Sequence, residues 1–298
     1  GHRFTYVVSP EEERENLTVE WFLRRHGYSR HIITGLKRTE DGIFRNGVRA
    51  WTSQAVHAGD VIETHLVETE PSDGILPRPV PFSVVYEDDD IIIANKPAGL
   101  TVDGGDADTL VKRVQAKLAA EGKPTHAVLA TVYRCINRLD RDTTGLIVLA
   151  KHALSAAVLS QAMRSREIHR TYQAFALGET AASGTIDAPI ARLDGSLIQR
   201  TVDFASGERS VTHYRTLAHC SVFSHLELNL ETGRTHQIRV HMAYIGHPLL
   251  GDTLYNKTPG TFPRQALHSA SLSFVHPITG EPLNFHAPLP EDMQNLLT

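Results

Sequence analysis

The sequence predicts an α+β protein with a small N-terminal α+β domain and a larger domain built around a mixed, mainly antiparallel β-sheet flanked by helices. Strand-like and helix-like segments mix along the chain without the strict alternation of a doubly wound fold. The length of 298 residues suggests about two domains. Three prolines between positions 77 and 81 favour an extended backbone. We therefore expect domains over 1–70 and 82–298, joined by a proline-rich linker over 71–81.

The N-terminal segment contains two helix-like stretches followed by short strands. Residues 19–25 form the first stretch, and Ile32, Ile33 and Leu36 form an apolar stripe at helical spacing. Asn46-Gly47 is typical of a tight hairpin turn. The expected strands cover 43–44, 48–51 and 61–66. A unit of this size lies near the lower limit for independent stability, so we expect it to be an appendage of the larger domain.

The larger domain contains one segment that is almost continuously aliphatic. Residues 145–151 have this pattern, which is expected of a strand buried on both faces. The other expected strands cover 82–86, 91–95, 170–177 and runs within 211–230. The expected helices cover 153–166, 235–244 and a stretch from residue 110 that ends at Gly122.

Composition narrows the class of protein. A hydrophobic content of 41% and a charged content of 21% are ordinary for a globular chain and disfavour disorder. No apolar run approaches the roughly 20 residues of a membrane span, and residues 1–10 lack the apolar core of a secretory signal. The two cysteines are not at metal-ligand spacing, which fits a reducing compartment. We expect a cytoplasmic protein without membrane association.

Charge is unevenly distributed. The net charge of −4 does not by itself indicate a nucleic-acid-binding protein. Residues 21–50, however, carry seven basic side chains against two acidic ones. This local excess is a candidate phosphate-binding face, although codon usage could equally explain the many arginines.

A first polar cluster, Asn137-Arg-Leu-Asp-Arg-Asp-Thr-Thr-Gly145, leads directly into the aliphatic strand. Functional sites are often built on loops that are fixed to a core strand. Asp140 lies between Arg138 and Arg141, and neighbouring cations keep a carboxylate ionised, which suits a nucleophile or a base. A solvated turn with a capping aspartate is an equally good explanation of the spacing alone.

A second polar cluster, Glu231-Thr-Gly-Arg-Thr-His-Gln-Ile-Arg-Val-His241, leads into the expected helix at 235–244. On a helix, His236 and Arg239 would share one face, whereas Gln237 and His241 would share another. These side chains would therefore not converge on one metal ion. The sequence also lacks the spacing of zinc ligands and the glycine-rich loops that bind nucleotides, so no metal and no cofactor is expected.

Tyr172 is a further candidate. It alternates with Ala174 and Ala176 along an expected strand, so small neighbours could leave space above its ring. A core tyrosine is the commoner explanation of such a pattern.

Together these segments resemble the RluA family of RNA pseudouridine synthases. The first cluster is similar to the family's His-Arg-Leu-Asp segment, and residues 170–178 are similar to the strand that carries its active-site tyrosine. The segment 231–252 is similar to Gly-Arg-Thr/Ser-His-Gln-Ile-Arg-Val-His followed by Gly-Asp. Residues 86–99, with Asn95-Lys96-Pro97, and 267–297 resemble the first and last family segments. The resemblance covers about 82–298.

Ahead of this region, residues 29–66 resemble the small RNA-binding domain of ribosomal protein S4. This second resemblance is weaker. It implies that the basic stretch binds RNA phosphates, with an affinity that falls steeply with salt.

The family resemblance implies isomerisation of uridine to pseudouridine without a cofactor. Asp140 would attack the nucleotide or remove a ribose proton, Arg234 would pair with Asp140, and Tyr172 would stack on the target base and is a candidate to assist proton removal from carbon 5. The implied RNA contacts are Arg138, Arg141, Thr144, His236, Gln237 and Arg239 near the site, and Arg24, Arg25, Arg30, Lys37 and Arg38 in the N-terminal domain.

Two positions depart from the family pattern. Asn137 replaces the usual histidine, and we expect this change to alter RNA contacts more than chemistry. Asp103 stands in the first segment where the family commonly has Val-His-Pro, and an acidic side chain near the RNA path would repel phosphate.

The expected partner is RNA, most simply large-subunit ribosomal RNA because of the additional N-terminal domain, with transfer RNA as the alternative. A monomer is favoured. Two other classes remain open at this point: an RNA-binding or ribosome-assembly protein that has lost the reaction, and a histidine-rich, metal-dependent hydrolase.

Overall fold

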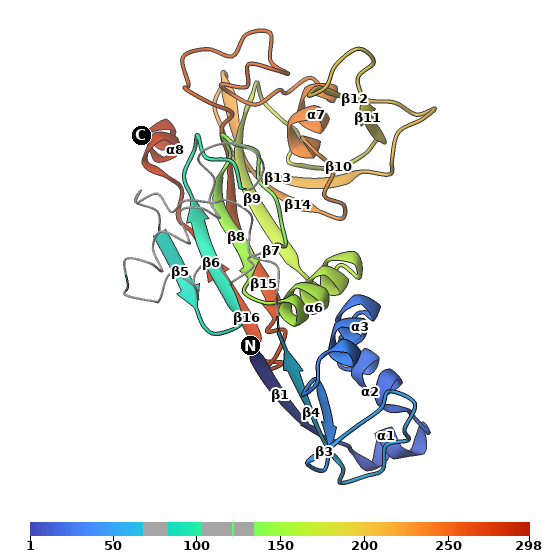
Figure 1. The fold of residues 1–298 in the computed structure, drawn as a ribbon. Coiled ribbons are helices and arrows are strands. Elements are labelled where there is room, and N and C mark those ends of the chain that lie inside the picture. Colours follow the sequence, from blue (N-terminus) through green and yellow to red (C-terminus); the bar gives the residue numbers. More distant parts are fainter. Residues whose placement is uncertain (68–82, 103–120, 122–133) are drawn as a thin grey trace.

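The structure is a computed structural model that describes residues 1–67, 83–102, 121 and 134–298. Two parts are visible in Figure 1, a small N-terminal part and a larger part built on a long sheet. The elements of the N-terminal part are β1 (His2–Val7), α1 (Pro10–Arg14), α2 (Val19–Arg25), α3 (Arg30–Arg38), β2 (Ile43–Arg45), β3 (Val48–Arg49) and β4 (Val61–Leu66). The proline-rich linker and Asp103 lie outside the described residues.

The N-terminal part is a four-stranded sheet, in the order β1-β4-β2-β3, with helices packed against it. Asn46 and Gly47 both have positive φ, at 52° and 78°, which is the backbone of the tight hairpin turn that the sequence predicts. The expected helices are found as α2 and α3. Two elements were not predicted from the sequence. They are β1, which pairs along its whole length with β4, and α1, which begins at a capping box formed by Ser9 and Glu12.

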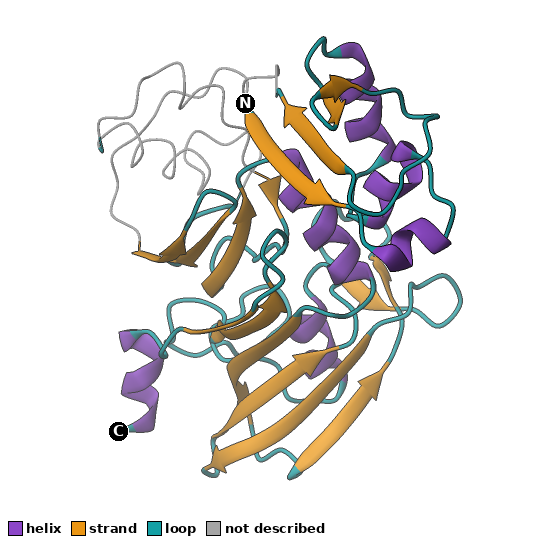
Figure 2. Cartoon of the chain, turned by 90° about the horizontal axis from the view of Figure 1, so that it is seen from below, coloured by secondary structure: helices purple, strands orange, loops and turns teal. Residues whose placement is uncertain are grey.

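The N-terminal part packs against the larger part through helix α6 (Ala153–Arg164). Leu154 of α6 is buried in the same apolar cluster as Phe22 and Leu23 of α2. A Cβ at Gly27 would lie 2.4 Å from Val158 of α6, so the two parts touch closely where only a hydrogen fits. Figure 1 shows α3 beside α6, and in Figure 2 the purple helices of the N-terminal part lie to one side of its orange strands.

The larger part is a ten-stranded sheet in the order β10-β13-β14-β9-β15-β8-β6-β5, with β16 paired to β15 and β7 paired to β8. Every pairing is antiparallel except that of β15 with β8, so the mixed, mainly antiparallel sheet expected from the sequence is confirmed. Its strands are β5 (Ser83–Glu87), β6 (Ile91–Lys96), β7 (Arg134–Cys135), β8 (Thr144–Ala150), β9 (His169–Leu177), β10 (Ser183–Asp187), β13 (Val211–His219), β14 (Phe223–Leu230), β15 (Leu267–Val275) and β16 (Pro282–His286).

Strand β8 is buried along its whole length and divides its side chains between two cores. Leu146 and Val148 point into the cluster that contains Leu159 of α6. Ile147 and Leu149 point into the opposite cluster, which contains Ile238 of α7 (Gln237–Tyr244). The two helices therefore cover opposite faces of the sheet, and this double burial explains the aliphatic run in the sequence.

The remaining elements are short. They are β11 (Ile190–Arg192), β12 (Arg200–Val202), α8 (Glu291–Gln294) and the 3₁₀ helix η1 (Asn295–Leu297). The expected helix at 153–166 ends at Arg164, and the one at 235–244 begins at Gln237. The expected helix from residue 110 to Gly122 lies outside the described residues except for residue 121. Within the described part of the chain, no helix combines the length and apolar character needed to cross a bilayer.

Candidate active site

Asp140 lies in the loop that leads into β8, and the end of β6 fixes this loop. The carbonyl oxygen of Arg141 accepts hydrogen bonds from Lys96 Nζ at 2.7 Å and from the backbone N–H groups of Gly99 and Leu100 at 2.9 and 3.2 Å. Within the loop, the carbonyl oxygen of Asp140 accepts the N–H of Thr143 at 3.0 Å. The backbone next to Asp140 is therefore held from both sides.

Lys96 is buried although it carries an ionisable amine. Only 1% of the residue is exposed, and its Nζ donates to the carbonyl oxygens of Pro97 and Arg141. Burial removes the hydration of the ammonium group and lowers the pKa of Lys96 to about 7. At neutral pH this amine is thus partly uncharged while it supports the Asp140 loop.

This low pKa predicts a pH dependence of stability. A lysine in an unfolded chain has a pKa of about 10.4. Between about pH 7 and pH 10, Lys96 therefore binds a proton in the unfolded chain that it lacks in the folded chain. Stability then rises with pH in this window, by at most about 1.4 kcal/mol per unit from this group. Urea unfolding at about pH 7.5 and pH 9 should show that Lys96→Met loses this increment. Equal pH dependence in both proteins would contradict the assignment.

Arg239 of α7 is the side chain that contacts Asp140. Its Nη1 lies 3.2 Å from Asp140 Oδ2, while its Nε and Nη2 donate to the two carboxylate oxygens of Asp252 at 2.8 and 2.9 Å. Asp252 is fully buried, and the side chain of Arg239 is 8% exposed. Although burial opposes the charged guanidinium, the contacts with Asp252 and Asp140 outweigh it and raise the pKa of Arg239. The result is a fixed positive charge beside a half-buried carboxylate.

The expected pairing of Arg234 with Asp140 is wrong. Arg234 Nε donates to the carbonyl oxygen of Arg209 at 3.1 Å, and its Nη1 forms an ion pair with Glu208. The reason is the position of the helix: Arg234 precedes α7, whereas Arg239 lies within it on a buried turn. Arg234 still lines the cavity above Asp140, with 41% of its side chain exposed.

His236 stands next to Asp140 in an uncommon backbone conformation. It caps the N-terminus of α7 with a φ of 57°, and its Nε2 lies 3.8 Å from Asp140 Oδ1. Its Nδ1 shares a 2.6 Å hydrogen bond with the hydroxyl of Tyr255. Burial lowers the pKa of His236, so the imidazole is neutral at pH 7. His236 therefore lies beside the Asp140 carboxylate, a position that the sequence did not predict, and its expected RNA contact stays a prediction.

Tyr172 of β9 completes the site. It is 4% exposed and lies opposite Leu228 of β14 in the sheet register. Its ring lines the same cavity as Asp140, Arg239 and His236, together with the apolar side chains of Leu139, Leu230 and Leu267. A carboxylate, a paired guanidinium and an aromatic ring therefore converge from three separate segments of the chain.

A family model described as RNA pseudouridylate synthase matches residues 90–244, which span Asp140, Tyr172 and Arg239. The chain belongs to this family.

This pseudouridine synthase has close relatives of similar length. It is 38% identical over 289 residues to the uncharacterized RNA pseudouridine synthase YjbO of Bacillus subtilis, covering 94% of this chain and 98% of the relative. It is 43% identical over 256 residues to ribosomal large subunit pseudouridine synthase D of Vibrio cholerae, covering 80% and 76%. Among solved structures, human RNA pseudouridylate synthase domain containing 1 superposes with a TM-score of 0.58 at 25% identity, covering 70% of this chain and 83% of that chain.

Three of the polar residues singled out in the sequence are built into the fold of the pseudouridine synthase. Gln237 is buried and bonds to Thr232 and to the backbone of Val211. Thr144 is buried and bonds to His268. Gln237 nevertheless lines the cavity that contains Asp140, so the RNA contacts expected of Gln237 and Thr144 stay predictions. Asn137 is also buried, because its side chain bonds to the backbone of β8 on both sides. The expectation that Asn137 alters RNA contacts is therefore wrong.

Two of the other RNA contacts expected near the site, Arg138 and Arg141, are exposed. Arg138 is exposed and lines the cavity above Asp140. Arg141 is exposed and pairs with Asp142 at 3.3 Å. Arg239, by contrast, bonds to the carboxylates of Asp252 and Asp140. We therefore propose that it holds Asp140 in place rather than contacting RNA.

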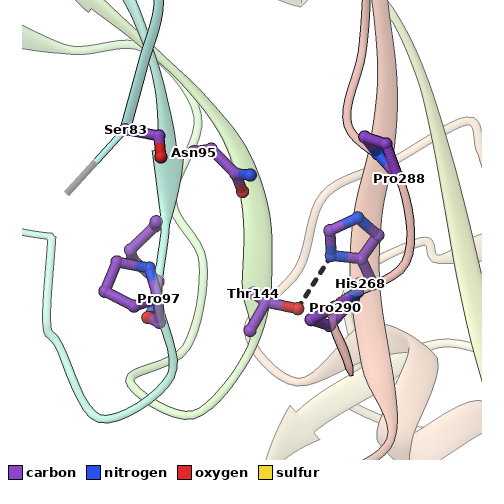
Figure 3. Close-up of a pocket in the computed structure, with 8 residues that line it drawn as sticks. Ser83, Asn95, Pro97, Thr144, His268, Pro288 and Pro290 are labelled. Carbon is purple, nitrogen blue, oxygen red and sulfur yellow. Dashed lines mark hydrogen bonds between the residues drawn. The ribbon is translucent and has the colours of Figure 1, made fainter. Parts of the chain in front are cut away.

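A larger cavity of about 350 Å³ is lined by residues of β5, β6, β8 and β15 and by two prolines after β16. Figure 3 shows its lining, in which Thr144 hydrogen-bonds to His268 at 2.8 Å. None of the described residues that line it is a carboxylate. Because the carboxylate that the sequence analysis singled out lies in the other cavity, with Arg239 and Tyr172, we take that cavity as the candidate active site.

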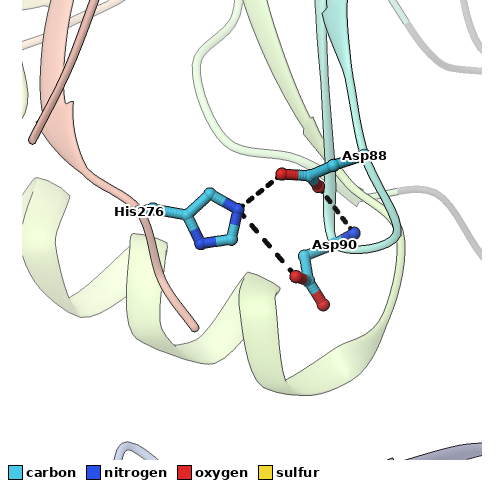
Figure 4. Close-up of side chains that lie close together, drawn as sticks. All are labelled: Asp88, Asp90 and His276. Atoms are coloured by element: carbon cyan, nitrogen blue, oxygen red, sulfur yellow. Dashed lines mark hydrogen bonds and ion pairs between the residues drawn. The ribbon is translucent and has the colours of Figure 1, made fainter. Parts of the chain in front are cut away.

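One cluster has the residue types of a metal site. Asp88, Asp90 and His276 lie together at the β5–β6 turn, as Figure 4 shows. His276 Nδ1 accepts two backbone N–H groups, so its Nε2 carries the proton and donates to Asp88 at 2.7 Å. Asp88 also accepts the N–H groups of residues 90 and 91. These bonds satisfy the cluster as a structural brace, and we derive no chemistry from it.

Sequence reasoning missed two members of the site, Asp252 and Tyr255. Asp252 stood at the end of the segment quoted for the resemblance, and a buried partner for Arg239 could have been sought there. Its carboxylate also accepts the N–H groups of Leu254 and Tyr255. This turn orients the Tyr255 ring, which the guanidinium of Arg239 approaches to within 5.1 Å of the centroid.

Proposed function

We propose that this pseudouridine synthase isomerises uridines of large-subunit ribosomal RNA at Asp140. The observation that carries the catalytic part of the proposal is the Asp140–Arg239 contact in a cavity faced by Tyr172. The substrate is suggested by relatives named for the ribosomal large subunit, of which one is 42% identical in Escherichia coli. Transfer RNA is the second candidate substrate for the same chemistry.

The reaction breaks the bond between N1 of uracil and C1′ of ribose and forms a bond between C5 and C1′. The base turns within the pocket, the proton on C5 leaves, and N1 gains a proton, so atoms and electrons balance without an oxidant. Asp140 either attacks the nucleotide or removes a ribose proton, and in both cases it acts as a carboxylate that the Arg239 guanidinium holds at 3.2 Å. A uridine in folded RNA must first leave its stack, at a cost of a few kcal/mol.

Tyr172 is placed to stack on the displaced base and to move a proton. Among the described residues its hydroxyl has no hydrogen-bond partner, so this group is free to face the substrate. If the hydroxyl assists removal of the C5 proton, Tyr172→Phe should lower kcat by about 10²- to 10⁴-fold. Single-turnover kinetics with bound RNA measures this step. A rate within threefold of wild type would limit Tyr172 to stacking.

The N-terminal part is proposed to bind RNA phosphates, but its cations differ in availability. Arg24 pairs with Glu20 and Arg25 pairs with Glu15, so these two are partly neutralised. Arg30, Lys37 and Arg38 lie exposed on α3, and no ion pair involves them within the part of the chain that the structure describes. We therefore centre the proposed phosphate contacts on α3.

The substrate proposal is tested with two RNAs labelled with tritium at uracil C5. Large-subunit ribosomal RNA and unmodified bulk transfer RNA are incubated separately with the enzyme, and label released to water is measured. Faster release from ribosomal RNA supports the proposal. Release from transfer RNA alone would replace the substrate and leave the chemistry intact, and Asp140→Ala with each RNA controls for contaminating activity.

A further inference from the structure

The two tryptophans of the chain both lie on the surface of the N-terminal part. Trp21 is 60% exposed and Trp51 is 63% exposed. A backbone hydrogen bond of 3.0 Å from Glu20 N to Thr52 O joins the residues next to them. Single exposed apolar residues are common, but two of the largest aromatic side chains at one junction, each beside an arginine, call for a function.

Trp51 is held in place from one side. The guanidinium of Arg49 lies over its ring at 5.5 Å from the centroid. Arg49 is itself fixed because its Nη1 donates to the carbonyl oxygen of Thr39 at 2.7 Å, at the end of α3. The backbone N–H of Trp51 donates to Gln54 Oε1 at 2.9 Å. The ring is thus an oriented surface, with a cation on one face.

A hollow of about 130 Å³ adjoins the ring of Trp51. Buried Leu36, Ile43 and Ala50 contribute its apolar lining, while Lys37 and Arg49 bring positive charge to it. An apolar hollow with an aromatic wall and cationic neighbours complements a flat base attached to a phosphate.

The surrounding charge favours RNA over an apolar partner. Lys37 and Arg38 extend from the end of α3 on the solvent side, and Arg30 lies two turns earlier on the same helix. Stacking on tryptophan requires an unstacked base, because bases inside a duplex have no free faces. A duplex would reach the cations of α3 but not the ring face.

We propose that Trp51, Lys37 and Arg49 form a stacking site for one unpaired base of the bound RNA, separate from the catalytic cavity. Trp51 supplies the ring face, Arg49 orients that ring, and Lys37 contacts the adjoining phosphate. The site would make the N-terminal part read single-stranded or looped RNA. That this RNA is the enzyme's substrate rests on the proposed function; the stacking itself does not.

The fluorescence of the two tryptophans can report on the proposed stacking. In Trp21→Phe, Trp51 is the sole source of tryptophan fluorescence, so stacking of a base on it should quench the emission. We expect a single-stranded RNA octamer to quench this variant strongly and an RNA duplex of equal length to quench it weakly. The reciprocal variant Trp51→Phe, which reports Trp21, is the matched control. Equal quenching by octamer and duplex would overturn the proposal.

Affinity gives the second measurement. Loss of one base–aromatic stack should weaken octamer binding by about 5- to 100-fold in Trp51→Ala, with most of the affinity retained in Trp51→Phe. Because Trp51 is exposed, circular dichroism should confirm an unchanged fold. Octamer affinity within twofold of wild type in Trp51→Ala would overturn the proposal. Asp140→Asn should retain the quenching, so failure of the stacking site and failure of the catalytic assignment give different results.

Discussion

Asp140→Asn is expected to abolish isomerisation while leaving RNA affinity close to wild type. The substitution keeps the size of the side chain but removes the negative charge that acts as nucleophile or base. Loss of such a group commonly costs about 10⁴-fold or more in turnover. The loop should keep its shape, because it is held through the backbone of Arg141 and Thr143. Tritium release and filter binding measure the two quantities.

Asp142→Asn is the matched control for this experiment. Asp142 lies two residues away, belongs to the same loop and pairs with exposed Arg141. The same chemical change there should lower turnover by less than about tenfold, since exposed ion pairs contribute little. If both variants lost activity equally, the loop and not the Asp140 carboxylate would be responsible.

Arg239→Ala is expected to produce the second large effect, on both turnover and stability. It removes the cation beside Asp140 and leaves Asp252 fully buried without its partner. Breaking a buried ion pair in this way costs about 3 to 5 kcal/mol of stability. We also expect turnover to fall at least about 10²-fold, because the orientation and charge of Asp140 are no longer fixed. Urea unfolding and tritium release measure these effects.

Two further variants test whether these effects come from the contacts of Arg239. Arg239→Lys keeps the charge but cannot bind Asp252 through two parallel bonds, so it should recover part of the stability and little of the turnover. Arg234→Ala removes an arginine from the same segment whose contacts are with Arg209 and Glu208. It should leave stability nearly unchanged. Loss of stability in Arg234→Ala comparable to that in Arg239→Ala would contradict the arrangement described.

The sequence predicted the sheet class and the segments of the site better than the contacts within it. The aliphatic run at β8 was found because burial on both faces leaves a local signal. Strand β1 was missed although it carries a local signal. Phe4 and Tyr6 pack against the N-terminal core and alternate with exposed Arg3 and Thr5, but the run is short and pairs with β4, about 60 residues away.

The sequence alone did not show whether Arg234 or Arg239 is the partner of Asp140. Both lie in one polar segment, and selecting the partner of Asp140 requires the start and rotation of α7. The helix begins at Gln237, after His236 adopts a left-handed backbone, and a position of this kind is hard to predict for a residue other than glycine. The burial of Thr144 and Gln237, which were expected to contact RNA, was not predicted either, since a buried polar side chain and an exposed one look alike in sequence.

Isomerisation at Asp140 is tested most directly by following both products of one reaction. RNA labelled with tritium at uracil C5 is incubated with the wild-type enzyme, and label released to water is compared with pseudouridine recovered from the digested RNA. The account predicts equal molar amounts of the two, and neither product with Asp140→Asn. RNA binding without release, or release that persists in Asp140→Asn, would contradict it.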